Sequence, residues 1–292
     1  MNKRFIGFSL LLLSTMIYGF YGILSRYIGA FGPFSQAWVR YCIIITTIII
    51  LLLSKKFSWK KIDPKDFKWF LLWILPASFQ PVLTFIAFNH LPIGITNFLL
   101  YSTMILGGII SGKVFFKEIF GPEKVIALIL TIGGLYLIYQ TDITLINNPY
   151  VFLAILSGFI LGLWNTLSKK VSQNYHELQM ILLDSLSTLA VGLSGAMIIG
   201  ETLPTFQNSA PWYWILIFSF SGIITSLLLI RGFKYLEAQT GSLILPMELF
   251  FASLFGYLFF GERLGLNIYI GGLLIAISSI VPNIYTIYKS KQ

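Results

Sequence analysis

The chain has 292 residues, of which 57% are hydrophobic and 11% are charged, and its mean hydropathy is +0.83. A water-soluble domain cannot bury so large an apolar fraction, so the composition excludes a soluble protein and indicates several membrane-spanning helices. The net charge of +9 does not indicate nucleic-acid binding, because the basic residues form no face outside the loop 55–68.

Ten apolar stretches follow one another along the chain. A helix of about 20 such residues crosses the roughly 30 Å hydrocarbon core of a bilayer. Turn-forming residues, often Gly-Pro or Asn-Pro, separate the stretches, and the connections are short. We therefore predict an all-α membrane protein with ten transmembrane helices, at residues 5–28, 34–54, 67–89, 93–116, 122–140, 149–171, 176–199, 211–234, 239–260 and 266–287.

The distribution of basic residues predicts the orientation of these spans. With a cytoplasmic N-terminus, seventeen of the twenty Lys and Arg residues fall on the inner side, six of them in the loop 55–68. Only Arg26 and Arg263 then fall outside, and Arg40 lies within the second span. We expect an integral protein of a plasma or bacterial inner membrane, with both termini cytoplasmic and with basic loops that contact anionic lipid.

The second half of the chain repeats features of the first. Three segments match in order at offsets of 143 to 145 residues: 19–26 with 162–169, 87–91 with 232–236, and 115–118 with 259–262. Each half has five predicted spans, an odd number, so the second half must enter the membrane in the opposite sense. We predict two inverted five-helix repeats, residues 1–143 and 144–292, which is an architecture typical of secondary transporters.

These features resemble the drug/metabolite transporter superfamily, in its ten-span EamA-like branch, over almost the whole chain. The resemblance is carried by the Phe-Phe-x-Glu ends of spans four and nine, by paired glycines in spans five and ten, and by the Gly-x-x-x-x-x-Ser-Arg/Lys ends of spans one and six. Where the family often has a Glu-Pro pair, this chain has Glu248-Leu249, with a proline earlier at Pro246. The resemblance implies a polar central cavity lined by spans one, three, four, six, eight and nine, and it favours export.

Three ionisable residues lie well inside predicted spans: Arg40, Asp184 and Glu248. A charged side chain in lipid costs about 2.5–3.5 kcal/mol on insertion scales, so these residues should face the bundle interior or a wet cavity. Glu248 and Asp184 are candidates for groups that couple transport to a proton or a cation. For Glu248 the alternative is a protonated carboxyl whose only role is to form hydrogen bonds between helices. Arg40 would bind a substrate carboxylate or phosphate, pair with Asp184, or extend toward the membrane surface.

Aromatic and amide side chains complete the candidate substrate site, because such groups suit amphipathic organic cargo. The amides are the stronger candidates, since a buried amide must find partners, whereas most single aromatic residues simply pack or lie at the membrane interface. Prolines Pro76, Pro81 and Pro246 permit kinks in spans three and nine. The candidates, besides Arg40, are Tyr18, Tyr21, Gln80, Asn97, Tyr101, Trp164 and Asn165.

The sequence does not support an enzyme. Cys42 is the only cysteine, the two histidines lie at span ends, and neither a phosphate-binding Gly-rich loop with Lys nor a His-Glu-x-x-His motif occurs. Residues 192–195 (GLSG) resemble the serine motif of rhomboid-type proteases, but no histidine follows His176. We therefore expect no catalytic residue, no metal and no cofactor.

The function expected from these observations is secondary active transport. The protein would bind a small organic solute or metabolite between its repeats and alternate access, with possible proton coupling. Its partners would be that solute and membrane lipid, without nucleic acid, and it would be a monomer or a homodimer. The alternative is a membrane bundle that scaffolds or senses without transport, and a sealed, dry interior would favour it.

Overall fold

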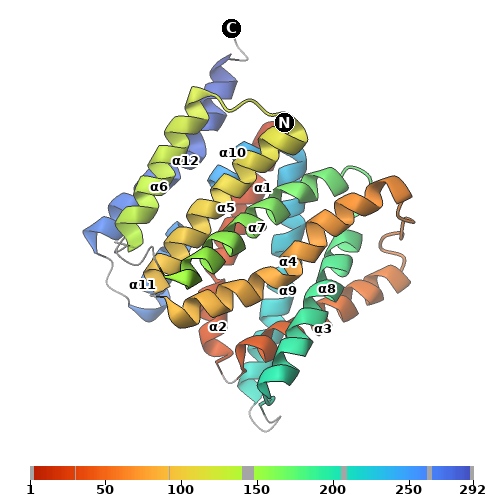
Figure 1. The fold of residues 1–292 in the computed structure, drawn as a ribbon. Coiled ribbons are helices and arrows are strands. Elements are labelled where there is room, and N and C mark those ends of the chain that lie inside the picture. The colour runs from red at the N-terminus through yellow and green to blue at the C-terminus, as the bar shows by residue number, and fades with distance from the viewer. Residues whose placement is uncertain are drawn as a thin grey trace.

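The computed structural model describes residues 3–29, 31–91, 93–139, 148–204, 209–261 and 265–289. Within these ranges the regular structure is entirely α-helical, and the helices lie in the ten predicted stretches (Figure 1). Helices α1 and α2 share the first stretch, and α10 and α11 share the ninth. The helices are α1 (Lys3–Gly19), α2 (Tyr21–Tyr27), α3 (Pro33–Leu53), α4 (Pro64–His90), α5 (Ile93–Phe116), α6 (Pro122–Tyr139), α7 (Pro149–Val171), α8 (Glu177–Ile199), α9 (Ser209–Tyr235), α10 (Ala238–Ile244), α11 (Met247–Phe260) and α12 (Leu266–Lys289).

Eight helical segments in the described part of the chain are long and apolar enough to cross a membrane. Large apolar side chains also cover the outside of the bundle, such as Leu53, Met197 and Ile198, which are 77%, 75% and 85% exposed. In water these side chains would be unfavourable, whereas in lipid they meet a solvent of their own kind. The protein is therefore an all-α integral membrane protein, and the number of ten crossings stays a prediction.

The helix ends follow from the turn residues in the sequence. Proline stands in the first turn of α3, α4 and α7, where its missing N–H leaves no helical hydrogen bond unmade. The Asp63 carboxylate accepts a hydrogen bond from the Lys65 backbone N–H, and the Asn148 side chain accepts one from Tyr150. These N-caps satisfy backbone donors that a helix start leaves free. The predicted breaks at Asp63-Pro64 and Asn148-Pro149 are thus confirmed.

Two pairs of helices define opposite sides of the bundle. Helices α6 and α12 lie side by side on one side, and α3 and α8 pack together on the other (Figure 1). Between them, α1 packs on α9, α4 packs on α7, and α5 lies against α7 and α10. The short helix α10 lies inside the bundle, where every one of its residues is buried.

Glycines permit the close crossing of α6 and α12. A Cβ atom at Gly134 would lie 2.6 Å from the Gly271 carbonyl oxygen, and one at Gly271 would lie 2.5 Å from the Gly134 carbonyl oxygen. Because both obstacles are backbone atoms, a side chain at either position would push the helices apart. Next to the crossing, Thr131 donates a hydrogen bond of 2.7 Å to Ser278.

We predict that Gly134→Ala lowers the free energy of unfolding by about 1–3 kcal/mol, because the added methyl group overpacks this crossing. Gly133→Ala is the matched control, since a Cβ atom at Gly133 meets nothing within 4 Å. The control should be neutral or stabilising, because glycine is the poorer helix former. Thermal unfolding of both variants in detergent measures the difference, and equal midpoints would refute the crossing.

Candidate functional site

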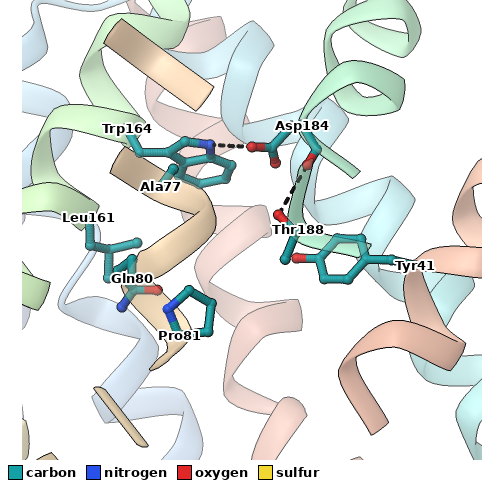
Figure 2. Close-up of a pocket in the computed structure, with 8 residues that line it drawn as sticks. All are labelled: Tyr41, Ala77, Gln80, Pro81, Leu161, Trp164, Asp184 and Thr188. Atoms are coloured by element: carbon teal, nitrogen blue, oxygen red, sulfur yellow. Dashed lines mark hydrogen bonds between the residues drawn. The ribbon is translucent and has the colours of Figure 1, made fainter. Parts of the chain in front are cut away.

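A cavity of about 120 Å³ lies between α3, α4, α7 and α8. Figure 2 shows the Trp164 indole and the Asp184 carboxylate turned toward each other, and the indole Nε1 donates a hydrogen bond of 3.1 Å to Asp184 Oδ1. Figure 2 also shows Tyr41 and Thr188 on the same side of the cavity. The Thr188 hydroxyl donates to the Asp184 backbone carbonyl at 3.0 Å. The lining residues are Tyr41, Ala77, Gln80, Pro81, Leu161, Trp164, Asp184 and Thr188.

Gln80 holds the wall of this cavity between α4 and α7. Its Nε2 donates to Thr84 at 2.9 Å and to Ser157 at 3.1 Å, so the amide nitrogen is satisfied by protein groups. The Ser157 hydroxyl also donates a hydrogen bond of 3.3 Å to the backbone carbonyl oxygen of Gln80. The amide nitrogen of this half-buried side chain is therefore bonded to protein groups, and Gln80 keeps its place in the cavity lining.

Asp184 has no cationic partner among the described residues. In the part of the chain that the structure describes, no basic side chain lies within ion-pair distance of its carboxylate. Of the alternatives for Arg40, the pair with Asp184 is thus not formed. A carboxylate offers about four acceptor sites, so Asp184 retains capacity for a donor or a cation from within the cavity.

Arg40 lies instead against aromatic rings. Its Cζ atom is 4.0 Å from the centroid of the Phe218 ring and 5.1 Å from that of Tyr21. Such cation–π contacts stabilise a guanidinium where water is scarce. The Arg40 Nε atom is buried without a hydrogen-bond partner, so this residue also has a donor to offer a ligand.

Glu248 is the second residue of α11, just after the interruption at Leu245 and Pro246. Tyr101, Tyr18 and Tyr139 all lie near enough to its carboxylate to interact with it, and Tyr101 is placed to donate its hydroxyl proton to the carboxylate. Glu248 therefore faces α1, α5 and α6 inside the bundle and not the lipid. Tyr18 also stacks edge-on with Tyr21, at 4.8 Å between ring centroids, which links Glu248 to the aromatic surroundings of Arg40.

The structure thus divides the predicted site residues into two clusters. Gln80, Trp164 and Asp184 line the cavity between α3, α4, α7 and α8. Around Arg40 and Glu248 gather Tyr18, Tyr21 and Tyr101. Asn165 is buried and Asn97 is half-buried, and neither lines the Asp184 cavity.

Several residues of these clusters escape the sequence analysis. Tyr41 directly follows Arg40, and Thr188 lies one helical turn after Asp184, so helical spacing around the two charged residues would have found both. Phe218 and Thr225 of α9 carry no such signal. Their place beside Tyr21 depends on how α9 packs on α1 and α2.

A separate polar cluster holds the end of the bundle near the N-terminus. The Glu118 carboxylate accepts hydrogen bonds from the Ala238 and Gln239 backbone N–H groups, at 2.7 and 2.9 Å, and from Lys169 Nζ at 3.2 Å. It therefore caps the N-terminus of α10, a structural role for the glutamate of the first Phe-Phe-x-Glu motif. Its repeat equivalent, Glu262, and the neighbouring Arg263 lie outside the described residues.

Glu237 pairs with two cations in the same cluster. Lys124 Nζ lies 2.7 Å from Glu237 Oε2, and an Arg4 nitrogen lies 3.0 Å from Oε1. Burial alone raises the pKa of this carboxyl, but the hydrogen bond from Lys124 and the charges of Lys124 and Arg4 lower the pKa overall. The cluster joins the chain start to α6 and to the start of α10.

The bundle is helical and carries carboxylates, an arginine and amides in its interior. These features place the protein in the class of integral membrane proteins with buried polar sites. The model of the EamA-like transporter family matches the chain twice, over residues 5–140 and 148–283, and the chain belongs to this family. The resemblance seen in the sequence is thereby confirmed. The family consists of transporters and not of enzymes.

The fold is also similar to that of a solved protein. A crystal structure superposes with a TM-score of 0.81 over 97% of this chain and 96% of that chain. The two sequences are 13% identical, so this likeness concerns the fold alone. The search of curated proteins gave no match to this chain.

Proposed function

We propose that the protein is a secondary transporter that moves small organic solutes by alternating access between two inverted five-helix repeats, residues 1–143 and 144–292. Family membership supports the transport of small solutes in general. The observation that carries the finer proposal is that contacts of the first repeat recur in the second at the offsets found in the sequence. Such equivalence is what alternating access needs, because each repeat must be able to take the conformation of the other.

Hydrogen bonds recur in this way. The Ser14 hydroxyl donates to the Thr225 carbonyl at 3.1 Å, and the Ser157 hydroxyl approaches the Gln80 carbonyl at 3.3 Å. The serines are 143 residues apart and the carbonyls 145 residues apart, as in the repeat. The first contact joins α1 to α9, and the second joins α7 to α4.

Aromatic contacts recur at the same offsets. Tyr21 and Phe218 contact edge-on, at 4.6 Å between ring centroids. Their equivalents, Trp164 and Trp73, lie 6.3 Å apart, and the Trp73 indole donates to the Trp164 carbonyl at 2.9 Å. One pair stands beside Arg40 and the other beside Asp184. The two aromatic pairs, at equivalent positions of the proposed repeats, thus stand beside ionisable residues of opposite charge.

Opposite membrane orientation of the repeats is supported by the ends of α3 and α8. The connection after α8 brings Glu201 to the start of α3, where it accepts hydrogen bonds from the Phe34 and Ser35 backbone N–H groups at 3.2 and 2.6 Å. At the other end, the backbone N–H of Lys60, after α3, donates to the Gln179 side chain in the first turn of α8 at 3.0 Å. The helices thus run antiparallel, as equivalent helices of inverted repeats would.

In the proposed mechanism, solute binds between the two polar clusters and rocking of the repeats exposes it to each side in turn. Asp184 and Glu248 are the proposed coupling groups, because each carboxylate has neutral hydrogen-bond donors and lacks a basic partner among the described residues. Arg40, Tyr18, Tyr21, Gln80, Tyr101 and Trp164 would contact the solute. The scaffold alternative leaves the unpaired Asp184 inside a cavity without a role.

Transport itself is tested in reconstituted vesicles. Vesicles loaded with a mixture of small metabolites are diluted into isotopically labelled mixture, and mass spectrometry follows exchange. We expect at least one organic solute to exchange in vesicles with protein and not in protein-free vesicles. Exchange of no solute in either direction would favour the scaffold.

We further propose that the membrane is the plasma or inner membrane and that both termini are cytoplasmic. In a Cys42→Ser protein, Lys60→Cys should react with an impermeant thiol reagent only after cells are permeabilised, because the loop 55–68 lies on the inner side. Leu203→Cys, in the exposed connection after α8, should react in intact cells. The reverse pattern of labelling would overturn the orientation.

A further inference from the structure

The cavity beside Asp184 adjoins two further cavities. The second, of about 80 Å³, shares Pro81 and Thr188 with the first. The third, of about 560 Å³, shares Phe34, Val82 and Val191 with the second. These three adjoining cavities, called the path below, extend from a carboxylate inside the bundle to a much larger apolar groove between α3, α4 and α8.

The large groove faces away from the bundle interior. Its walls include Phe79, Val82 and Ile86 of α4 and Val191 and Ile198 of α8. Phe79 is 52% exposed and Ile198 is 85% exposed. Helix α8 is long and apolar enough to cross a membrane, and α4 is one of the ten predicted spans, so we expect the groove to open to lipid. It lies toward the C-terminal ends of α4 and α8, which form the outer side in the proposed orientation. Its lining is suited to an alkyl or aryl group and offers almost nothing to a charged one.

The inner end of the path is suited to a cation. The Asp184 carboxylate has one side-chain donor, the Trp164 indole, and no basic partner among the described residues. A buried carboxylate is costly without a partner, and the cavity leaves room for one. The aromatic side chains of Trp164 and Tyr41 stand at the same cavity, and aromatic faces attract organic cations.

We propose that this path is a binding site for an amphiphilic cation, with the cationic nitrogen beside Asp184 and the apolar tail in the groove between α3, α4 and α8. The inference rests on the proposed transport function and names the substrate class of its Asp184 site. Because the tail space is open along the side of the bundle, the ligand would enter from the outer half of the bilayer and not from the aqueous phase. Neither end of the path alone carries the assignment; it rests on an unpaired carboxylate and an apolar groove lying at the two ends of adjoining cavities.

The test uses alkyltrimethylammonium ions from tetramethyl- to decyltrimethylammonium and wild-type protein in lipid nanodiscs, with empty nanodiscs to subtract partitioning into lipid. Affinity should rise up to about fourfold for each added methylene until the groove is filled. Asp184→Asn keeps the side-chain shape and should weaken every member by about tenfold or more, because it removes the charge. Asp184→Glu should restore much of the binding, and decyl sulfate should not compete.

The tail site is tested with a matched pair of tryptophan variants on α4. Val82→Trp fills the groove and should abolish the dependence of affinity on chain length, while tetramethylammonium binding stays unchanged. Leu71→Trp places the same side chain about three turns away on an exposed part of α4, and should keep the full dependence. Chain-length dependence that survives Val82→Trp would place the tail elsewhere.

The outcomes separate this inference from the transport proposal. If the vesicles exchange other solutes while Asp184→Asn leaves alkylammonium binding unchanged, the cation site is wrong and transport stands. If alkylammonium ions bind in the Asp184-dependent way and vesicles exchange nothing, the site stands and the transport proposal fails. Equal binding of decyl sulfate and decyltrimethylammonium would show a lipid-tail groove without cation recognition and would overturn the inference.

Discussion

Replacement of Glu118 by alanine is expected to lower the free energy of unfolding by about 3–5 kcal/mol, the cost of breaking a buried ion pair by removing one partner. The Glu118 side chain is only 7% exposed, and it binds two backbone N–H groups of α10 as well as Lys169. Its loss leaves these donors and the Lys169 charge without their acceptor. The short helix α10, which lies against α5, would then lose the contact that fixes its start.

The measurement is thermal unfolding of purified protein in detergent, together with the yield of monodisperse protein. Glu118→Gln keeps one acceptor oxygen and should fall between wild type and Glu118→Ala. Glu123→Ala is the control: Glu123 lies in the first turn of α6, where the loss of a favourable helix-dipole interaction costs about 0.3–1 kcal/mol. If Glu118→Ala unfolds at the same temperature as Glu123→Ala, the capping role of Glu118 is wrong.

Glu248→Gln is expected to abolish accumulation of solute against a gradient while exchange continues. Glutamine keeps the shape of the side chain and an acceptor for the Tyr101 hydroxyl, so the site should stay assembled. It cannot ionise, however, so it cannot carry a proton or bind a cation. A transporter so altered would equilibrate its solute without using an imposed gradient.

The experiment compares wild-type and Glu248→Gln vesicles under an imposed pH gradient, with a solute found by exchange. Wild type should concentrate the solute, and the variant should reach only the external concentration. Size-exclusion profiles of the two proteins must agree, so that a loss of fold is recognised as a structural role. Uphill transport by the variant at the wild-type level would end the coupling assignment.

Much of the fold follows from local features of the sequence. Hydropathy gives the helical stretches, and turn residues such as Asn148-Pro149 give their ends, because both depend on neighbours in the chain. The Phe-Phe-x-Glu and glycine motifs suffice to recognise the family. No proline marks the break between α1 and α2, so the local sequence does not predict it. There Gly19 packs so closely on Phe251 that a Cβ atom would lie 2.8 Å from the Phe251 Cβ.

The candidate site is less accessible to sequence reasoning. The sequence identifies Arg40, Asp184 and Glu248 as buried ionisable residues, since charges within apolar spans are conspicuous. It does not predict their partners. Arg40 lies on Phe218, and Asp184 meets Trp164, because contacts between distant helices depend on packing and not on local pattern. The apolar groove likewise arises only when α4 and α8 are set side by side.

If the protein alternates access, its interior opens to each side of the membrane in turn, and a single cysteine in the Asp184 cavity should report this. Thr188→Cys in a Cys42→Ser protein places a thiol where the first two cavities meet. We expect this thiol to react with an impermeant reagent in both right-side-out and inside-out vesicles. The fully buried Ser278, changed to cysteine, should react in neither. Reaction of the thiol at position 188 from one side only, or from neither, would contradict alternating access.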